Sequence, residues 1–261
     1  MSDWLHNLPV VWMVVVVFGV TYLITLAIFA VVKTLATGER ARSFKAVSPG
    51  MLPPLGILFG LFVAFTAAQV WSDNDRADAA VNREASALRS VVILSSALPE
   101  QAGARLRSLI RSHIENAVNV EWPIMEKRSA TLGPIPRGLA DALASTLALN
   151  LANPGQQTAQ RDIATQLEMA LEARRQRILT SRSQVSFVKW LCIFVQAACA
   201  LFAIAMVHSD NGLAAGITMG IFATGVATSV LLIAVYDRPF VGQLAIGPQP
   251  LLQVMPDATE K

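Results

Sequence analysis

The sequence predicts an all-α membrane protein with four transmembrane helices in two hairpins and an extramembrane four-helix domain inserted between helices 2 and 3. Of its 261 residues, 54% are hydrophobic and 15% are charged, whereas soluble proteins carry roughly 25% charged residues. Long apolar runs occur in two pairs, at residues 9–32, 52–71, 187–208 and 212–236. Each covers at least 20 residues, the length that a helix needs to cross about 30 Å of hydrocarbon. A polar stretch of about 115 residues separates the pairs.

The positions of these runs define the predicted domain boundaries. Residues 1–71 form the first transmembrane hairpin, residues 72–186 the extramembrane domain, residues 187–236 the second hairpin and residues 237–261 a C-terminal tail. The first run is longer than the core of a signal peptide and no basic residue precedes it, so we interpret it as a retained helix. Lys189 lies inside the third run, close enough to its end for the ammonium group to reach the membrane surface.

The basic residues near the membrane predict two opposite orientations. The connector between the first two runs contains Lys33, Arg40, Arg42 and Lys45, which by the positive-inside rule places this connector in the cytoplasm. The second hairpin has Arg182 and Lys189 before it, Arg238 after it and no basic residue in its turn. This arrangement indicates the reverse orientation, so both remain open.

Small residues recur every four positions in the second and fourth runs. They are Gly56, Gly60, Ala64 and Ala68 in the second, and Gly212, Gly216, Gly220, Thr224 and Thr228 in the fourth. Small side chains at this spacing let two helix backbones approach closely within a membrane. The pattern therefore predicts close helix packing, either within a hairpin or between subunits.

The opposite face of the second run carries larger side chains, namely Leu55, Leu58, Phe62, Phe65 and Gln69. Such a face contacts lipid in many membrane proteins, but it also suits a hydrophobic constriction that gates a pore by dewetting. Asp73 and Asp75 follow this run. In a ring of subunits they would form an acidic mouth that favours cations, and in a single helix they would favour a first turn. A calcium loop is not indicated, because its glycine and distal glutamate are missing.

The polar stretch reads as four helices, at about residues 72–98, 101–120, 137–151 and 157–183. Pro99, the sequence Glu121-Trp122-Pro123, residues 133–136 and residues 153–155 mark the breaks between them. Short breaks between helices of this length are typical of an antiparallel bundle. No Gly/Ser-rich joint separates this domain from the apolar runs, so we expect the flanking helices to continue straight into it.

Two charges interrupt the apolar stripes of this domain. Glu84 lies 13 residues after Trp71, and Arg174 lies 13 residues before Phe187. At 1.5 Å per residue both lie about 20 Å from the apolar runs, so we predict that they face each other as a partly buried ion pair. The neighbouring basic run Arg174–Arg177 is typical of a solvated or lipid-facing helix patch, and His113 is typical of a core histidine rather than of a sensor or a ligand.

No motif of an enzyme or of a bound cofactor is present. The sequence contains no glycine-rich phosphate loop, nucleophile elbow or H-E-x-x-H motif, so we expect neither catalysis, cofactor nor metal. Its two cysteines, Cys192 and Cys199, lie seven residues apart in the third run, too far apart on one helix to form a disulfide. The net charge of +3, without a basic block interleaved with aromatics, favours contact with anionic lipid over nucleic acid.

Three short motifs carry a resemblance that covers about residues 9–250. Glu84-Ala85, Glu121-Trp122-Pro123 and Asp237-Arg238-Pro239-Phe240 together resemble the bestrophin-like bacterial membrane proteins, which are catalogued as a domain of unknown function. Bestrophins proper are pentameric anion channels whose second helix lines a hydrophobic neck. The resemblance implies that Phe62 and Phe65 lie in a neck, that the polar domain is cytosolic and that the chain resides in a bacterial inner (plasma) membrane. The sequence lacks the acidic calcium clasp of true bestrophins, and Asp73 and Asp75 disfavour anions.

We therefore expect a homo-oligomeric ion channel or channel-like membrane protein, with a hydrophobic neck on helix 2 and a helical vestibule. Its expected partners are the lipid bilayer, copies of itself and ions. The alternative is a membrane-anchored sensor or scaffold whose helical domain binds a ligand or a partner protein. The short sequence after Tyr236 leaves no output domain for a sensor, which favours the channel.

Overall fold

The computed structural model describes residues 8–37, 44, 49–133 and 137–257, and every regular element among them is helical. The chain divides into two compact units. The membrane unit comprises Met1–Ser72 and Gln184–Asp237, and the polar unit comprises Asp73–Ser183 and Arg238–Lys261. Among the described residues, four helices are long and apolar enough to cross a membrane. The all-helical class and the four membrane helices predicted from the sequence are thus confirmed.

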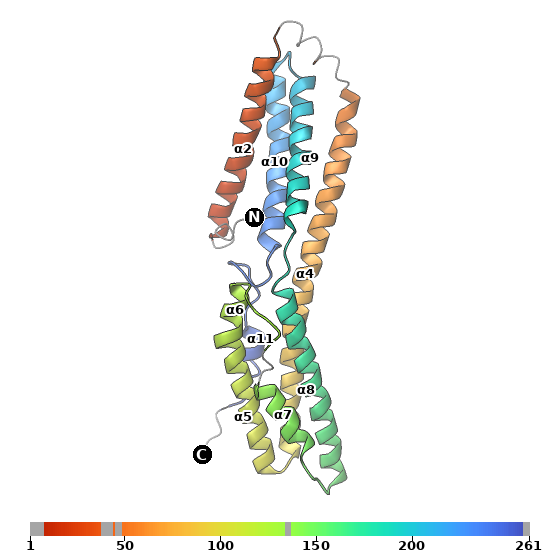
Figure 1. Ribbon diagram of the computed structural model, residues 1–261, viewed down its shortest axis with the longest axis vertical. Coiled ribbons are helices and arrows are strands. Elements are labelled where there is room, and N and C mark those ends of the chain that lie inside the picture. The colour runs from red at the N-terminus through yellow and green to blue at the C-terminus, as the bar shows by residue number, and fades with distance from the viewer. Residues whose placement is uncertain (1–7, 38–43, 45–48, 134–136, 258–261) are drawn as a thin grey trace. The chain divides into compact units, whose positions relative to one another are not determined.

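The four membrane helices begin close to the predicted positions. They are α2 (Val10–Leu35), the first part of α4 (Leu52–Leu94), α9 (Phe187–Val207) and α10 (Gly212–Tyr236). Helix α10 packs against both α2 and α9, as Figure 1 shows. The side chains of Asn211 and Ser186 accept hydrogen bonds from the first turns of α10 and α9, which satisfies backbone donors that a helix leaves unpaired at its start. The connector between α2 and α4 lies largely outside the described residues.

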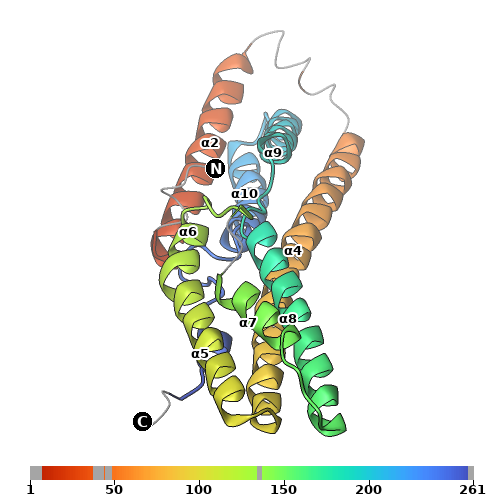
Figure 2. The same cartoon turned by 60° about the horizontal axis from the view of Figure 1, so that its bottom comes forward.

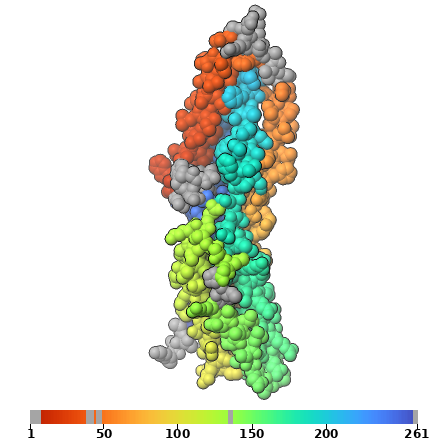
Figure 3. All heavy atoms as spheres, viewed as in Figure 1, coloured from red at the N-terminus to blue at the C-terminus, as the bar shows by residue number. Residues whose placement is uncertain are grey.

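The interior of the membrane unit is largely apolar, and a hydrogen bond joins a residue shortly before α9 to the residue after α10. Phe59, Trp190, Ile193, Val226 and Ile233 belong to its largest buried cluster. The backbone N–H of Val185 donates to Asp237 Oδ1 over 2.5 Å, so the residues before α9 and after α10 are held together. Large apolar side chains remain exposed on the outside, including Phe187, Leu191 and Phe194 of α9, a helix that appears in cyan in Figure 3. Such a surface suits lipid or another protein chain.

The polar unit contains the rest of α4 and the helices α5 (Glu100–Asn116), α6 (Trp122–Glu126), α7 (Arg137–Leu147), α8 (Pro154–Thr180) and α11 (Gln249–Leu252). Helix α7 packs between α5 and α8, as Figure 2 shows. The core consists of fully buried aliphatic side chains, among them Leu88, Ile110, Ile114, Leu139, Ile163 and Leu167. Their spacing of three and four residues explains why these segments form amphipathic helices.

The expected break at Glu121-Trp122-Pro123 is wrong. A single turn of π-helix, Ala117–Glu121, joins α5 to α6. The N–H of Trp122 bonds the carbonyl of Ala117, five residues earlier. Pro123 lies in the first turn of α6, where its missing N–H costs little. The expected turn at residues 133–136 lies mostly outside the described residues.

The other junctions differ in part from the expectation. Helix α4 passes without interruption from its apolar half into its polar half, as expected. Helices α8 and α9 are separate, because residues 181–186 are not helical. The segment expected to be a tail contributes Phe240 and Leu251 to the core of the polar unit. The segment after residue 237 is therefore part of the folded core of the polar unit rather than a free tail.

Candidate functional site

The predicted neck residues on α4 have different surroundings. Leu58 and Phe65 are 57% and 67% exposed. Phe62 is partly buried and packs against the core of the membrane unit. Gln69 accepts a hydrogen bond from Lys189 Nζ. Among the neck candidates, Leu58 and Phe65 are therefore the large apolar side chains that the rest of the described chain leaves exposed.

The glycines predicted to mediate helix packing make few contacts within the described chain. A Cβ added at Gly56, Gly60, Gly216 or Gly220 would meet no described atom within 4 Å outside its own helix. At Gly212 it would meet only Phe29 Cζ, at 3.9 Å. Close packing at these positions within one chain is not seen among the described residues. Packing between copies remains as a prediction.

The two predicted vestibule carboxylates follow the apolar half of α4. Asp73 Oδ1 lies 3.5 Å from Arg76 Nη1 one turn later, and Asp75 is exposed. Because Arg76 partly compensates the charge of Asp73, Asp75 is the stronger of the two candidates for attracting cations. No group of three or more possible metal-ligating side chains occurs in the described ranges.

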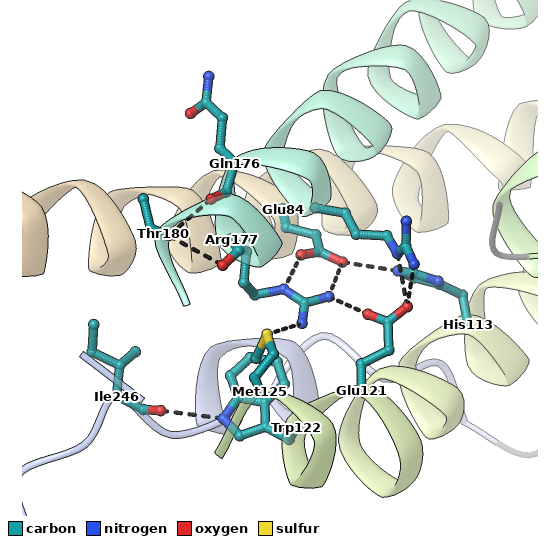
Figure 4. Close-up of polar contacts among 10 residues, drawn as sticks. Glu84, His113, Glu121, Trp122, Met125, Gln176, Arg177, Thr180 and Ile246 are labelled. Carbon is teal, nitrogen blue, oxygen red and sulfur yellow. Dashed lines mark hydrogen bonds and ion pairs between the residues drawn. The ribbon is translucent and has the colours of Figure 1, made fainter. Parts of the chain in front are cut away.

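A buried charge network lies inside the polar unit, formed by Glu84, His113, Glu121, Arg174 and Arg177 (Figure 4). Arg177 is fully buried and donates hydrogen bonds to Glu84 from two of its nitrogens. Its Nε donates to Glu84 Oε2 over 2.7 Å, and its Nη2 to Glu84 Oε1 over 3.2 Å. A planar guanidinium matches a carboxylate in this forked geometry. Arg177 is thus not part of a solvated helix face.

The second carboxylate of the network is Glu121. Arg177 Nη2 donates to its Oε2 over 2.8 Å, while Arg174 contacts its Oε1 from Nε at 2.8 Å and from Nη2 at 2.6 Å. These contacts correct the predicted pairing of Glu84 with Arg174: Glu84 meets Arg177, and Arg174 meets Glu121. Glu121 ends the π-turn. Such turns are rare and frequently mark functional sites.

His113 connects the network to α5. Its Nε2 lies 2.9 Å from Glu84 Oε1, and its side chain is fully buried. An ionised carboxylate only accepts hydrogen bonds, so Nε2 carries the hydrogen in this contact. His113 Nδ1 has no hydrogen-bond partner in the described part of the chain. The expectation of a core histidine agrees with its burial, but only one ring nitrogen is satisfied.

Within the network, Glu84 and Arg177 strongly favour their ionised states. Burial acts to raise the pKa of the Glu84 carboxyl, but the charge of Arg177 and the hydrogen bond from His113 lower that pKa to about 2. Burial likewise acts to lower the pKa of Arg177, and Glu84 and then Glu121 raise it above its ordinary value. Two carboxylates and two guanidiniums therefore balance one another, which offsets the cost of burying them.

Trp122 connects this network to the C-terminal segment. Its ring lies 4.6 Å below the guanidinium carbon of Arg177 and meets the ring of Phe240 edge-on, with 5.9 Å between centroids. Its Nε1 donates to the carbonyl of Ile246 over 3.2 Å. All three short motifs found in the sequence are thus joined in space, because Arg177 bonds both Glu84 and Glu121 and Trp122 contacts Phe240.

Glu84 should make folding sensitive to acid. Folding lowers the pKa of its carboxyl from 4.5 to about 2, so within this window the unfolded chain binds more protons than the folded one. The contribution of the ionised Glu84 to the free energy of unfolding is therefore present above pH 4.5 and is lost as the pH falls toward 2. We expect Glu84→Gln, which lacks the titrating group, to lose less stability on acidification than the wild type. Urea unfolding across this window measures the difference, and equal losses would contradict the assignment.

These features together define a class. An all-helical chain with four helices of membrane-spanning length and a polar helical unit is a multi-pass membrane protein. The chain belongs to the Bestrophin-like family, because the Bestrophin-like domain matches residues 9–251. It is therefore a channel-like membrane protein, and membership of a channel family agrees with the expectation that it is not an enzyme.

Solved structures show the same fold at low sequence identity. A crystal structure of a bacterial Bestrophin homolog from Klebsiella pneumoniae, carrying a point mutation, has a TM-score of 0.69 at 12% identity and covers 93% of this chain and 97% of that chain. Another variant of that homolog has a TM-score of 0.66 at 14% identity over 95% of both chains. A crystal structure described as a membrane protein has a TM-score of 0.67 at 13% identity over 94% of this chain and 99% of that chain. No curated protein matches the chain.

Proposed function

We propose that the chain is a homo-oligomeric ion channel of the bacterial inner membrane and that α4 lines its central axis. One observation carries the proposal: α4 of a Bestrophin-like chain presents Leu58 and Phe65, both large and apolar, without cover from its own chain. Copies of this face arranged around an axis would form a hydrophobic constriction, which can gate by dewetting. Phe62 packs against the buried cluster of the membrane unit, so it would hold the neck face of α4 in place.

Contacts between copies would use the small-residue faces. Gly60 on α4 and Gly216 and Gly220 on α10 have open space around them in one chain. Helices with small residues at this spacing associate by close backbone packing. In the assembly these faces would meet neighbouring copies, whereas other apolar faces would contact lipid.

The polar unit would form the vestibule, with Asp73 and Asp75 near its mouth. A ring of carboxylates raises the local concentration of cations and repels anions. Arg76 reduces the field of Asp73, so Asp75 would dominate. The proposed channel therefore favours cations.

Conductance measurements with α4 variants test the neck. In planar bilayers we expect the purified wild-type chain to conduct, and Leu58→Ala and Phe65→Ala to raise the conductance severalfold because each removes apolar bulk from the constriction. Leu23→Ala is the matched control, since Leu23 on α2 is also 67% exposed but would face lipid or a neighbouring copy. Native mass spectrometry of the same preparations gives the number of copies. A monomer without conductance, or a Phe65→Ala channel indistinguishable from Leu23→Ala, would contradict the proposal.

A further inference from the structure

Lys189 places a positive charge inside the membrane unit. It is the third residue of α9, a helix that has no other charged side chain, and it is only partly exposed. The start of a helix is the positive end of its dipole and disfavours a cation, so the stability of α9 does not explain a lysine here. Charged residues within membrane helices are costly and frequently mark the path of an ion or a substrate.

The described partner of the Lys189 ammonium is neutral. Lys189 Nζ donates to Gln69 Oε1 on α4, and Lys189 forms no ion pair in the described part of the chain. The described acidic residues of the membrane unit are Asp210 and Asp237. Asp210 follows the other end of α9, and Asp237 accepts the backbone N–H of Val185 over 2.5 Å. No carboxylate among the described residues therefore pairs with this charge.

Gln69 fixes the position of the charge relative to the proposed neck. It follows Phe62 by seven residues and Phe65 by four on α4, so the three side chains share one face of the helix. If this face lines the axis, the ammonium bound to Gln69 lies at the wall of the pore, about 6 Å along the helix from Phe65. Asp75 follows Gln69 by six residues on the same helix. Along α4, Lys189 would therefore act between the neck and the acidic mouth.

We infer that, in the proposed channel on which this role rests, Lys189 sets the charge selectivity in opposition to Asp75. A ring of ammonium groups beside a constriction repels cations and attracts anions. The field of a charge is also stronger in confined surroundings of low dielectric constant than in bulk water. Gln69 is the positioning residue, because its amide oxygen holds the ammonium at α4. The wild-type channel would thus prefer cations less strongly than its acidic mouth alone would dictate.

Two substitutions separate the charge of Lys189 from the contact that it makes. Lys189→Gln removes the charge and keeps an amide that can hydrogen-bond Gln69. Gln69→Glu keeps the lysine and its contact, but the added carboxylate compensates the ammonium. If the contact only joined α4 to α9, Gln69→Glu would behave as the wild type does. If the charge sets selectivity, both variants should change selectivity in the same direction.

Reversal potentials of the full chain in planar bilayers, measured under a gradient of potassium chloride, give the ratio of potassium to chloride permeability. We expect Lys189→Gln and Gln69→Glu each to raise this ratio severalfold, because each removes the local excess of positive charge. Lys189→Arg retains the charge and should keep the ratio of the wild type. The matched control is Lys33→Gln, since Lys33 is an exposed lysine at the end of α2 whose Nζ lies 5.8 Å from the centroid of the Phe29 ring. It should leave the ratio unchanged.

The outcomes distinguish this role of Lys189 from the channel itself. A conducting wild type whose permeability ratio is the same in Lys189→Gln or in Gln69→Glu would overturn the role of Lys189 and leave the channel proposal intact. An equal change in Lys33→Gln would also overturn it, because the ratio would then report only the net charge of the chain. A wild type that carries no current would overturn both.

Discussion

Replacement of Arg177 by methionine should lower the free energy of unfolding by about 3–5 kcal/mol, the usual cost of removing one partner from a buried ion pair. Arg177 is fully buried and bonds both Glu84 and Glu121. Without it, Glu84 would keep its hydrogen bond from His113 but lose its guanidinium partner, and Glu121 would keep the contacts with Arg174 alone among those described. Methionine has a similar length and no charge, so the loss reports mainly on the charge and its hydrogen bonds.

The neighbouring residue supplies the control for this experiment. Arg175 is 61% exposed and lies 3.6 Å from Glu172 one turn earlier, and exposed pairs of this kind contribute about 0–1 kcal/mol. Arg175→Met should therefore unfold nearly as the wild type does in urea. Combining Arg177→Met with Glu84→Gln should cost less than the sum of the two single changes, because the double variant no longer contains the unpaired Glu84 charge. Strict additivity would show that Glu84 and Arg177 do not interact.

Replacement of Trp122 by alanine should destabilise the protein by about 3–5 kcal/mol, as large-to-small changes of buried aromatic residues do. The indole is 9% exposed and lies between the guanidinium of Arg177 and the ring of Phe240. Its removal takes away a packing surface, a cation–π contact and the hydrogen bond to Ile246. We expect the C-terminal segment to become sensitive to protease in this variant.

Trp122→Phe separates these contributions. Phenylalanine keeps an aromatic face below Arg177 and beside Phe240 but lacks the N–H that bonds Ile246. Trp122→Phe should therefore lower the free energy of unfolding clearly less than Trp122→Ala does. Limited proteolysis of Trp122→Phe should leave the C-terminal segment intact. If Trp122→Phe and Trp122→Ala were equally unstable, ring packing would not be the source of the stability.

The membrane helices could be predicted from the sequence because their determinant is local. A helix in lipid needs about 20 apolar residues, and α10 begins and ends at the predicted residues. The end of helix α5 could not be predicted in this way. Proline after Glu121 and Trp122 is a common helix-ending signal, but a π-turn allowed the helix to continue through Pro123.

The candidate site was only partly predictable for a related reason. Glu84 and Arg174 were recognisable as charges on apolar stripes, and both are buried in the network. The pairing was not, because it depends on how helices are aligned with one another. Arg177 lies on the same helix face as Arg174, three residues later, and Glu121 turns inward at the π-turn. The basic run and the Glu121-Trp122-Pro123 motif were the available signals for these two residues.

The role of the C-terminal segment could not be read from its composition. Residues after 237 contain prolines, glycines and scattered apolar side chains, which is typical of a loop. Phe240 and Leu251 are nevertheless buried in the polar unit. Contacts between residues more than a hundred positions apart, such as Trp122 with Phe240, leave no periodic pattern in a sequence.

The proposed pore can be tested most directly at position 65. In a background with Cys192 and Cys199, the two free cysteines, changed to serine, Phe65→Cys is exposed to a positively charged, water-soluble methanethiosulfonate during current recording. If α4 lines a conducting axis, the reagent will reach the thiol, place a fixed cation in the neck and block the current, while Leu23→Cys on α2 stays insensitive. A current through Phe65→Cys that the reagent leaves unchanged, as in Leu23→Cys, would contradict the account.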